Sequence, residues 1–321
     1  MVYGTDNMLT TSVIIPTYNR PYDLTVTIAS ILKQTIKPDE IIVLDDGDLQ
    51  DPPLQSKALR SGVNYIYIKK NDRDKGLTKS RNIGIRHAKG DIVFFFDDDV
   101  ELFPDYIEKI LHRYEASPEI DGIGGNSFIK RKLTLFERLF FFYDILFCLT
   151  GFKKGYFVSS GFSTDLGNPN LRTRFSKVEF LGGASFSFKK KVFKEFNFSE
   201  DFKGYGLGED KEFTYRVSKK YHLAICTDAK LFHYESPLMR YQMRDRGKAK
   251  ILSKYYFVSK CNIKNKFNGF FFCYAIIGYL LKRILIMLIS YDSGEVDRVK
   301  GILEGISEIG KIHNFLGNDN I

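Results

Sequence analysis

The stretch GDIVFFFDDDVELFP, residues 90–104, places a run of apolar residues directly before three consecutive aspartates. A short run rich in aromatic and β-branched residues is typical of a buried β-strand. The carboxylates that follow, Asp97, Asp98 and Asp99, repel one another unless a positive charge lies between them. We therefore expect a strand over residues 91–99 whose carboxyl end binds a cation.

Three other stretches have the same character: residues 12–18 (SVIIPTY), 40–46 (EIIVLDD) and 63–69 (VNYIYIK). Apolar residues at helical spacing fill the intervening segments 20–35 and 75–90. Strands that alternate with helices indicate β-α-β units and a largely parallel sheet. The sequence therefore predicts an α/β fold.

Polar side chains stand at the carboxyl ends of three of these strands. In parallel sheets the ligand crevice lies beyond that edge. We expect the residues there to form one site: Thr17, Tyr18, Asp45, Asp46, Asp97 and Asp99. Taken alone, the DDGD sequence of residues 45–48 is equally typical of an ordinary turn.

The second half of the chain, from about residue 105, carries further motifs. Residues 178–196 (VEFLGGASFSFKKKVFKEF) indicate a strand that is interrupted by two glycines and followed by a helix. Residues 206–220 indicate a helix that opens on two acids, which the positive end of a helix dipole favours. Residues 222–237 indicate a strand that ends at His233.

Five motifs together resemble the family 2 glycosyltransferases of the GT-A fold over residues 12–237. In chain order they are VIIPTYNRP, IIVLDDGD, GLTKSRNIGIRHAKGDIVFFFDDD, FLGGASFSFKK and GEDKEFTYR. The run 204–237 is most similar to the rhamnosyltransferase-like branch, whose members often attach sugars to lipid-linked or polysaccharide acceptors. The resemblance implies a Rossmann-like, mostly parallel central sheet flanked by helices.

The resemblance also implies an inverting transfer of a sugar from a nucleotide-diphosphate donor to an acceptor hydroxyl. Asp97 and Asp99 match the family's D-x-D motif, and alternate side chains of a strand share a face. They would hold Mn²⁺ or Mg²⁺, because these ions prefer oxygen ligands and stabilise charge on a leaving diphosphate. His233 matches a family histidine that reaches the metal or the diphosphate, although a lone histidine is more often structural.

The donor side is expected on the same basis. Asp45 with its neighbours resembles the family's base-recognition group, and Arg81 resembles its diphosphate-facing arginine. The full donor-binding set is Pro16, Thr17, Tyr18, Asp45, Asp46, Arg81, Asp98 and Gly183. Simpler interpretations treat Arg81 as a surface charge, Asp98 as a solvated acid and the glycine pair as a bulge.

Asp210 occupies the base position of the family's ED motif, and an inverting transfer needs a general base to take the acceptor proton. Glu209 is expected to orient the acceptor or its loop. The alternative is that both are only helix N-terminal acids.

The formal net charge of the chain is +9, and the basic residues are concentrated between residues 236 and 268. That segment holds nine basic residues against one acidic residue, with no nucleic-acid signature, so we expect it to face anionic lipid. The four cysteines lack zinc or disulfide spacing, which favours a reducing compartment. The first residues lack the apolar core of a secretory signal.

Two segments have membrane character. Residues 133–152 predict an apolar helix with a narrow polar stripe and basic flanks, typical of the membrane interface, with core burial as the alternative. Residues 269–291 are long enough to span a bilayer, but Lys282 and Arg283 lie at the middle, where each costs about 2.5 to 3.5 kcal/mol. We expect a shallowly embedded helix whose two cations reach the lipid headgroups.

We therefore expect a GT-A domain over residues 1–237 and a basic, hydrophobic, membrane-associated helical region over residues 238–321. Residues 12–104 would bind the donor and residues 105–237, with the helix 133–152, the acceptor. The expected partners are a UDP-, dTDP- or GDP-sugar, a lipid-linked or polysaccharide acceptor and an anionic membrane surface, but no nucleic acid. The expected location is the cytoplasmic face of the cell membrane, as a peripheral or monotopic protein.

The same residues fit three other functions. A polyprenyl-phosphate glycosyl synthase shares the fold, but its acceptor phosphate needs no base, which counts against it given the motif at Asp210. A processive polysaccharide synthase would resemble its class in a Q-x-x-R-W motif, whereas this chain contains no tryptophan. A non-catalytic protein that binds membranes or polyanions would use the basic segment and leave the aspartates without a role.

Overall fold

The computed structural model describes residues 9–128, 135–164, 175–202, 207–236, 242–261 and 266–317. The chain divides into two compact units. The first comprises residues 1–130 and 167–239, and the second residues 131–166 and 240–321. The segment 133–152 thus groups with the C-terminal helices, while the expected domain boundary at residue 237 stays a prediction.

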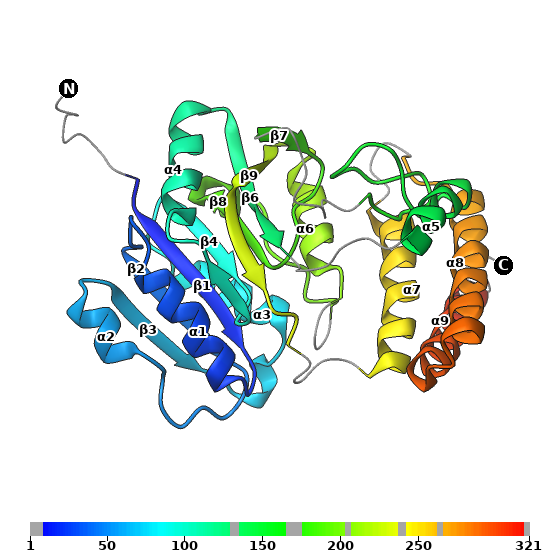
Figure 1. The fold of residues 1–321 in the computed structure, drawn as a ribbon, viewed down its shortest axis with the longest axis horizontal. Helices are drawn as coiled ribbons and strands as arrows, with labels where there is room; N and C mark the ends of the chain where they lie inside the picture. Colours follow the sequence, from blue (N-terminus) through cyan, green and yellow to red (C-terminus); the bar gives the residue numbers. More distant parts are fainter. Residues whose placement is uncertain are drawn as a thin grey trace. The chain divides into compact units, whose positions relative to one another are not determined.

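Nine strands are present among the described residues of the first unit: β1 (Thr11–Thr17), β2 (Glu40–Asp45), β3 (Asn64–Lys69), β4 (Ile92–Phe96), β5 (Val100–Leu102), β6 (Ile120–Phe128), β7 (Phe175–Val178), β8 (Ser185–Lys189) and β9 (His222–His233). They form one sheet in the order β3-β2-β1-β4-β8-β6-β9-β5, with β7 also paired to β9 (Figure 1). Strands β3, β2, β1 and β4 are parallel, whereas β8, β5 and β7 run antiparallel to their partners. The α/β fold is confirmed, and beyond β4 the sheet is mixed.

Helices flank this sheet within the first unit (Figure 1). They are α1 (Pro21–Leu32), α2 (Gln55–Arg60), α3 (Leu77–His87), α4 (Tyr106–Ala116) and α6 (Glu209–Val217), with the short 3₁₀ turns η1 (Asp72–Asp74) and η2 (Lys190–Lys194). Helix α1 begins with Pro21, whose fixed φ suits the first helical position, and it buries Leu24, Ile28 and Ile31. The helices expected over residues 20–35 and 75–90 are therefore present as α1 and α3.

The central strands are covered on both faces, which explains their continuous apolar sequences. Phe94 and Phe96 of β4 belong to one apolar cluster with residues of β1 and β2. Phe95 points to the other face, where it stacks on Phe186 of β8 with ring centroids 5.0 Å apart. Strands buried on both faces have no polar side to alternate with the apolar one.

The three aspartates lie in a turn rather than at the end of one strand. Strand β4 ends at Phe96, and β5 starts at Val100, which lies opposite His233 in the antiparallel β5–β9 pair. The expected strand 91–99 is therefore shorter, because the chain turns after Phe96 and the next strand, β5, pairs with β9 instead. The helix expected after β8 is only the 3₁₀ turn η2.

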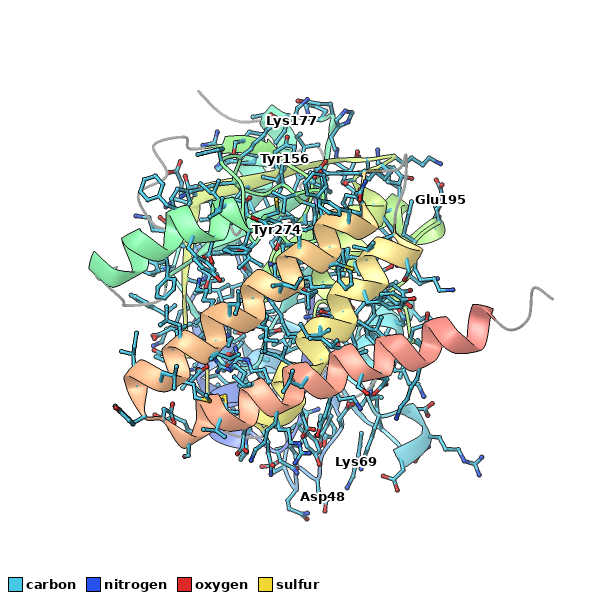
Figure 2. All side chains as sticks on the ribbon, turned by 90° about the vertical axis from the view of Figure 1, so that its right-hand side faces the viewer. Asp48, Lys69, Tyr156, Lys177, Glu195 and Tyr274 are labelled. Atoms are coloured by element: carbon cyan, nitrogen blue, oxygen red, sulfur yellow. The ribbon has the colours of Figure 1, made fainter. Side chains whose placement is uncertain are left out.

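The described helices of the second unit are α5 (Leu135–Leu146), α7 (Met243–Lys260), α8 (Gly269–Ser290) and α9 (Ser293–Gly317). Helices α7 and α9 cross closely because a glycine lies at the contact: a Cβ on Gly301 would overlap the backbone of Arg244. Helix α8 contributes Phe272, Ala275 and Ile276 to an apolar cluster with residues of the neighbouring helices. In Figure 2, Tyr274 labels helix α8, and α9 runs back from the C-terminal end of that helix.

Within the described residues, α8 is the helix that is long and apolar enough to cross a membrane. Its two central cations, however, contact protein. Lys282 Nζ lies 2.7 Å from both carboxylate oxygens of Asp144, and Arg283 Nη1 lies 3.3 Å from both carboxylate oxygens of Glu295. The expectation that these cations reach lipid headgroups is wrong, because acids on α5 and α9 neutralise them. The basic residues 130–132 lie outside the described residues.

Candidate active site

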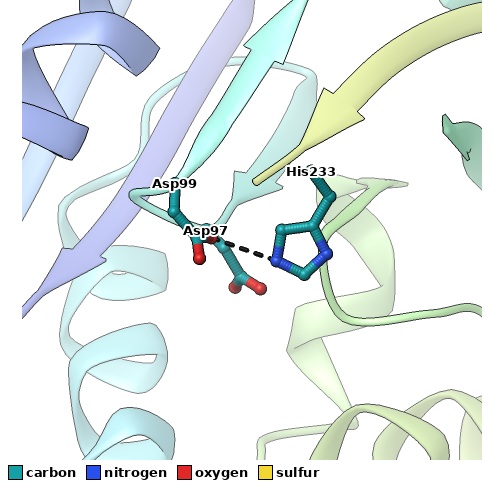
Figure 3. A group of neighbouring side chains, drawn as sticks. All are labelled: Asp97, Asp99 and His233. Carbon is teal, nitrogen blue, oxygen red and sulfur yellow. Dashed lines mark ion pairs between the residues drawn. The ribbon is translucent and has the colours of Figure 1, made fainter. Parts of the chain in front are cut away.

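The β4–β5 turn and the end of β9 bring two carboxylates and an imidazole together. Ligand atoms of Asp97, Asp99 and His233 all lie within 4.8 Å of one another. Figure 3 shows the three side chains converging, with His233 on β9 facing the turn. The β5–β9 register, which sets His233 opposite Val100, creates this neighbourhood between residues that are distant in the sequence.

Asp99 has a 2% exposed side chain, and both of its carboxylate oxygens have polar partners. His233 Nε2 lies 3.1 Å from Oδ1, and the backbone N–H of Ser236 donates to Oδ2 at 2.9 Å. Burial alone would raise the pKa of Asp99, but the hydrogen bonds from His233 and Ser236 together lower it. Burial alone would lower the pKa of His233, but Asp99 and the charge of Asp97 raise it. Asp99 is thus held as an anion.

Asp97 is more accessible, with a side chain that is 29% exposed and an Oδ1 atom 3.3 Å from Arg81 Nη2. Burial raises the pKa of Asp97, and Arg81 and His233 offset this only in part. The charges of Asp99 and Asp210 raise that pKa further. A further cation here would stabilise the ionised carboxylate.

Asp98 is buried, as Asp99 is. It accepts a hydrogen bond from the Thr17 hydroxyl at 2.7 Å and an ion pair from Arg20 Nη1 at 3.0 Å, and Arg20 Nη1 lies 3.8 Å from Asp99 as well. Burial raises the pKa of Asp98 to about 7, although Arg20 opposes the shift. The alternative interpretation of Asp98 as a solvated acid is therefore wrong, while its expected role in donor binding stays a prediction. Arg20 was not among the predicted site residues, and its signal was a charge placed between a buried strand and the start of a helix.

The donor set fits a divalent cation. Five carboxylates gather here, those of Asp97, Asp98, Asp99, Glu209 and Asp210, and among the described residues their guanidinium partners are Arg20 and Arg81. Acids gathered in a largely buried place repel one another, and a further cation among them would relieve this repulsion. Carboxylate oxygens are the ligands that Mg²⁺ and Mn²⁺ prefer, and imidazole also accommodates transition metals. Asp97, Asp99 and His233 are the residues that can hold such an ion.

Arg81 lies beneath this cluster and not on the surface. Its side chain is 1% exposed and forms ion pairs with Glu209 and Asp97, while the rings of Phe186 and Phe198 lie 5.3 Å from its guanidinium carbon. The interpretation of Arg81 as a surface charge is wrong. Its expected contact with the donor diphosphate stays a prediction, but the side chain has almost no surface to offer. Burial raises the pKa of Glu209, and Arg81 opposes that shift.

Asp210 follows Glu209 in the first turn of α6, a position where acids are favoured by the helix dipole. Its carboxylate lies against the backbone of Gly183: a Cβ at that position would be 3.1 Å from Asp210 Oδ2. A Cβ on Gly182 would meet nothing within 4 Å. Gly183 is therefore the glycine of this pair that packs against a predicted site residue.

The two acids of the β2 end have different environments. Asp45 is fully buried, and its carboxylate accepts hydrogen bonds from the backbone N–H groups of Gly47 and Leu49 and from the Tyr67 hydroxyl. Asp46 has a 13% exposed side chain that pairs with Lys70 Nζ at 2.5 Å. Asp45 thus shapes its own turn, as its DDGD sequence also allowed, and Asp46 is the acid with surface to offer a ligand.

The end of β1 supplies the remaining predicted donor residues. Pro16 is half-buried, opposite Leu44 of β2, and the Thr17 hydroxyl bonds to Asp98. Tyr18, directly after the strand, is 47% exposed. Of the three, Tyr18 offers an open surface.

The sequence profile of the family described as Glycosyl transferase family 2 matches residues 12–196. A chondroitin synthase of Escherichia coli is 28% identical over 239 residues, which are 70% of this chain and 35% of that protein. A GalNAc(5)-diNAcBac-PP-undecaprenol beta-1,3-glucosyltransferase of Campylobacter jejuni is 29% identical over 199 residues, which are 60% of this chain and 56% of that protein. The matched part of the chain thus spans well under two thirds of the length of either relative.

The crystal structure of GalNAc-T7 with UDP, GalNAc and Mn²⁺ is similar in fold, with a TM-score of 0.55 and 16% sequence identity. The similarity covers 79% of this chain and 49% of that one. At this identity it concerns the fold alone, a mixed α/β sheet of the GT-A type with flanking helices.

Proposed function

The chain belongs to glycosyl transferase family 2 and is a glycosyltransferase, and on that premise we propose that its transfer is inverting and metal-dependent. The proposed reaction moves a sugar from a nucleotide-diphosphate sugar to a hydroxyl of a lipid-linked glycan or polysaccharide. The observation that carries the proposal is the convergence of Asp97, Asp99 and His233, with Asp97 linked through Arg81 to the start of the helix that carries Asp210.

Held by Asp97, Asp99 and His233, Mn²⁺ or Mg²⁺ would stabilise the negative charge of the leaving diphosphate. Asp210 accepts the proton of the acceptor hydroxyl as that oxygen attacks the anomeric carbon. The new C–O bond forms opposite the breaking bond to the diphosphate, so the configuration at this carbon inverts. Glu209 and Arg81 act as positioning residues, because their buried ion pair ties the start of α6 to Asp97.

We assign the donor nucleotide to the edge where β1 and β2 end. Tyr18 offers an exposed ring for the base, and Asp46, rather than the buried Asp45, has carboxylate surface to face the donor. These two side chains are supported from the protein interior by Asp45, Pro16, Thr17 and Asp98. The donor is a UDP-, dTDP- or GDP-sugar of a hexose or deoxyhexose, and the motifs of residues 204–237 favour the rhamnosyltransferase-like branch.

The name of the Campylobacter jejuni relative includes an undecaprenol-linked acceptor. This supports a lipid-linked acceptor here, and with it a peripheral or monotopic location on the cytoplasmic face of the membrane. Residues 1–237 would then be the catalytic part, with the helix 133–152 in the membrane interface, and residues 238–321 the membrane-associated part.

The test is a thermal-shift screen of UDP-, dTDP- and GDP-sugars in Mn²⁺, in Mg²⁺ and in EDTA. A donor at 100 times its Kd stabilises the fold by about 2.7 kcal/mol, so we expect one donor to raise Tm with metal and to lose this effect in EDTA. Asp99→Asn should abolish the shift. Asp48→Asn, at an exposed acid paired with Lys69, should keep it. Binding of polyanions without metal and of no nucleotide sugar would instead favour a non-catalytic binding protein.

A further inference from the structure

Helix α8 presents a row of exposed apolar side chains along its whole length. Its members are Phe270, Ile277, Leu281, Leu285 and Leu288, which are 73%, 56%, 50%, 43% and 61% exposed. They follow one another at intervals of seven, four, four and three residues, so they share one face of the helix. We call this row the apolar stripe.

The opposite face of α8 packs against other helices of the second unit. Phe272, Ala275 and Ile276 are buried in the apolar cluster of the second unit. Lys282 and Arg283, the two central cations, also face this side, where they pair with Asp144 of α5 and Glu295 of α9. The apolar stripe is therefore free of the charges that made the helix unsuitable for lipid contact.

Helix α9 argues against a transmembrane course for α8. It starts at Ser293, just after α8 ends, and turns back, so that Glu295 reaches Arg283 at the middle of α8 (Figure 2). Asp297 and Lys300 follow on the exposed side of α9, with side chains 54% and 57% exposed. A bilayer around α8 would place these exposed charges in hydrocarbon, which is strongly unfavourable. The arrangement fits a helix that lies in the plane of the interface.

A second apolar patch belongs to the same unit. Phe142 and Leu146 of α5 and Phe152 of the following loop are 72%, 64% and 82% exposed. Helix α5 is fixed on α8 by the Tyr143 hydroxyl, which donates to the Gly278 carbonyl at 2.8 Å, and by Phe147, which stacks on Tyr274 at 5.1 Å.

Basic side chains adjoin this second patch. Lys153 and Lys154 follow Phe152 directly and are exposed. Their loop is held at the start of α8, because the backbone N–H of Asn268 donates to the Ser159 carbonyl at 2.9 Å. Apolar and basic surface therefore occur together at this end of α8, which is the combination that anionic lipid attracts.

We propose that the second unit docks on an anionic lipid bilayer with α8 lying in the membrane plane. The apolar stripe, with Phe142, Leu146 and Phe152, inserts among the acyl chains, while Lys153 and Lys154 contact the headgroup phosphates. The occupant is the bilayer and not a second copy of the chain. This inference rests on the membrane location in the proposed function but on none of its chemistry, so vesicle binding is measurable without donor or acceptor.

The first experiment compares two variants of the full chain in binding to phosphatidylcholine vesicles with and without phosphatidylglycerol. Ile277→Glu/Leu281→Glu should weaken binding to the anionic vesicles by about tenfold or more, because two inserted side chains become charged. Leu303→Glu is the matched control: Leu303 is also 50% exposed but lies on α9. It should change binding by less than about twofold, and equal losses in both variants would overturn the proposal.

The second experiment measures how deeply α8 lies in the bilayer. Cys273 is exposed on α8, so a nitrobenzoxadiazole label there, in a Cys148→Ser background, reports directly on the stripe side. Labels at Leu281→Cys and Leu288→Cys are made with Cys273→Ser added. Quenching by nitroxide lipids should place all three labels at one shallow depth. A Leu281 label much deeper than the other two would show that α8 spans the bilayer and overturn the proposal.

Self-association is measured in the same protein by mass photometry without lipid. A monomer that binds anionic vesicles supports the proposal. A dimer that the Ile277→Glu/Leu281→Glu change dissociates, with no vesicle binding, would assign the stripe to a second copy and refute the lipid assignment. Nucleotide-sugar binding by the same variants should be unaltered, so failure of the docking inference is distinguishable from failure of the proposed reaction.

Discussion

Arg81 forms a buried ion pair with Glu209, although 128 positions separate the two residues in the chain. Arg81 comes from α3 and Glu209 opens α6, the helix that also carries Asp210. The other end of the same guanidinium lies 3.3 Å from Asp97. One cation therefore links the proposed metal ligand to the helix of the proposed base, and the following predictions start from this link.

Replacing Arg81 should lower the stability of the protein as well as its rate of turnover. Arg81→Met leaves Glu209 and Asp97 buried without their counter-charge, and breaking such a pair costs about 3 to 5 kcal/mol. The free energy of unfolding in urea measures this loss. Adding Glu209→Gln should recover part of it, since the uncompensated charge is removed. Arg86→Met, at an exposed position on the same helix, should stay within about 0.5 kcal/mol of the wild type, and an equally stable Arg81→Met would contradict the role given to this pair.

His233 should contribute directly to metal affinity. His233→Gln removes one of three candidate ligands, and a loss of about 10- to 100-fold in Mn²⁺ affinity is expected, as for changes around other metal sites. Electron paramagnetic resonance of free Mn²⁺ measures this affinity. His222→Gln is the control because His222 is exposed at the opposite end of the same strand. Unchanged Mn²⁺ affinity in His233→Gln would remove His233 from the ligand set.

Asp210→Asn should separate chemistry from donor binding. The amide keeps the shape of the side chain but cannot accept the acceptor proton, so kcat should fall by about 10² to 10⁴. Donor affinity should be nearly unchanged, because Asp210 is not among the metal ligands. Steady-state kinetics with donor titration distinguish the two effects. Turnover close to that of the wild type would show that another group is the base.

The two adjacent glycines should respond differently to a methyl group. In Gly183→Ala the new Cβ would lie 3.1 Å from Asp210 Oδ2 and displace the carboxylate by a few tenths of an ångström. Displacement of a catalytic group by 1 Å can cost 10²-fold, so we expect a loss of about tenfold in kcat. In Gly182→Ala the methyl group has open space, and kcat should stay within about twofold. Equal effects in the two variants would contradict the placement of Asp210 against Gly183.

The α7–α9 crossing should tolerate no side chain at its centre. In Gly301→Ala the Cβ meets the backbone of Arg244, and overpacking of this kind costs about 1 to 3 kcal/mol. Gly310→Ala is a matched control on α9, because nothing lies within 4 Å of its Cβ. That change should stabilise by about 0.5 to 1 kcal/mol through helix propensity. Thermal unfolding compares the two, and a stabilised Gly301→Ala would show that the helices do not cross there.

Local patterns were sufficient to predict the parallel part of the fold. The strands β1, β2, β3 and β4 are short apolar runs bounded by turn residues, and the helices between them have clear periodicity. The motif residues follow from the same patterns, since polar groups after a parallel strand reach one edge of the sheet. The mixed part of the sheet could not be predicted from local patterns, because the antiparallel pairing of β5 with β9 joins segments far apart in the chain.

The identity of the acids was visible in the residues alone, but their partners were not. Asp98 and Asp99 are neighbours in sequence, and Arg20 Nη1 lies 3.0 Å from the first and 3.8 Å from the second. Beyond this shared cation, Asp98 accepts a hydrogen bond from Thr17, whereas Asp99 pairs with His233. Lys282, which by its spacing interrupts an apolar helix, is neutralised by Asp144 from another helix. A charge buried in a protein pairs with an opposite charge that the fold brings near it. Which residue becomes the partner depends on long-range contacts, and these cannot be predicted from local spacing.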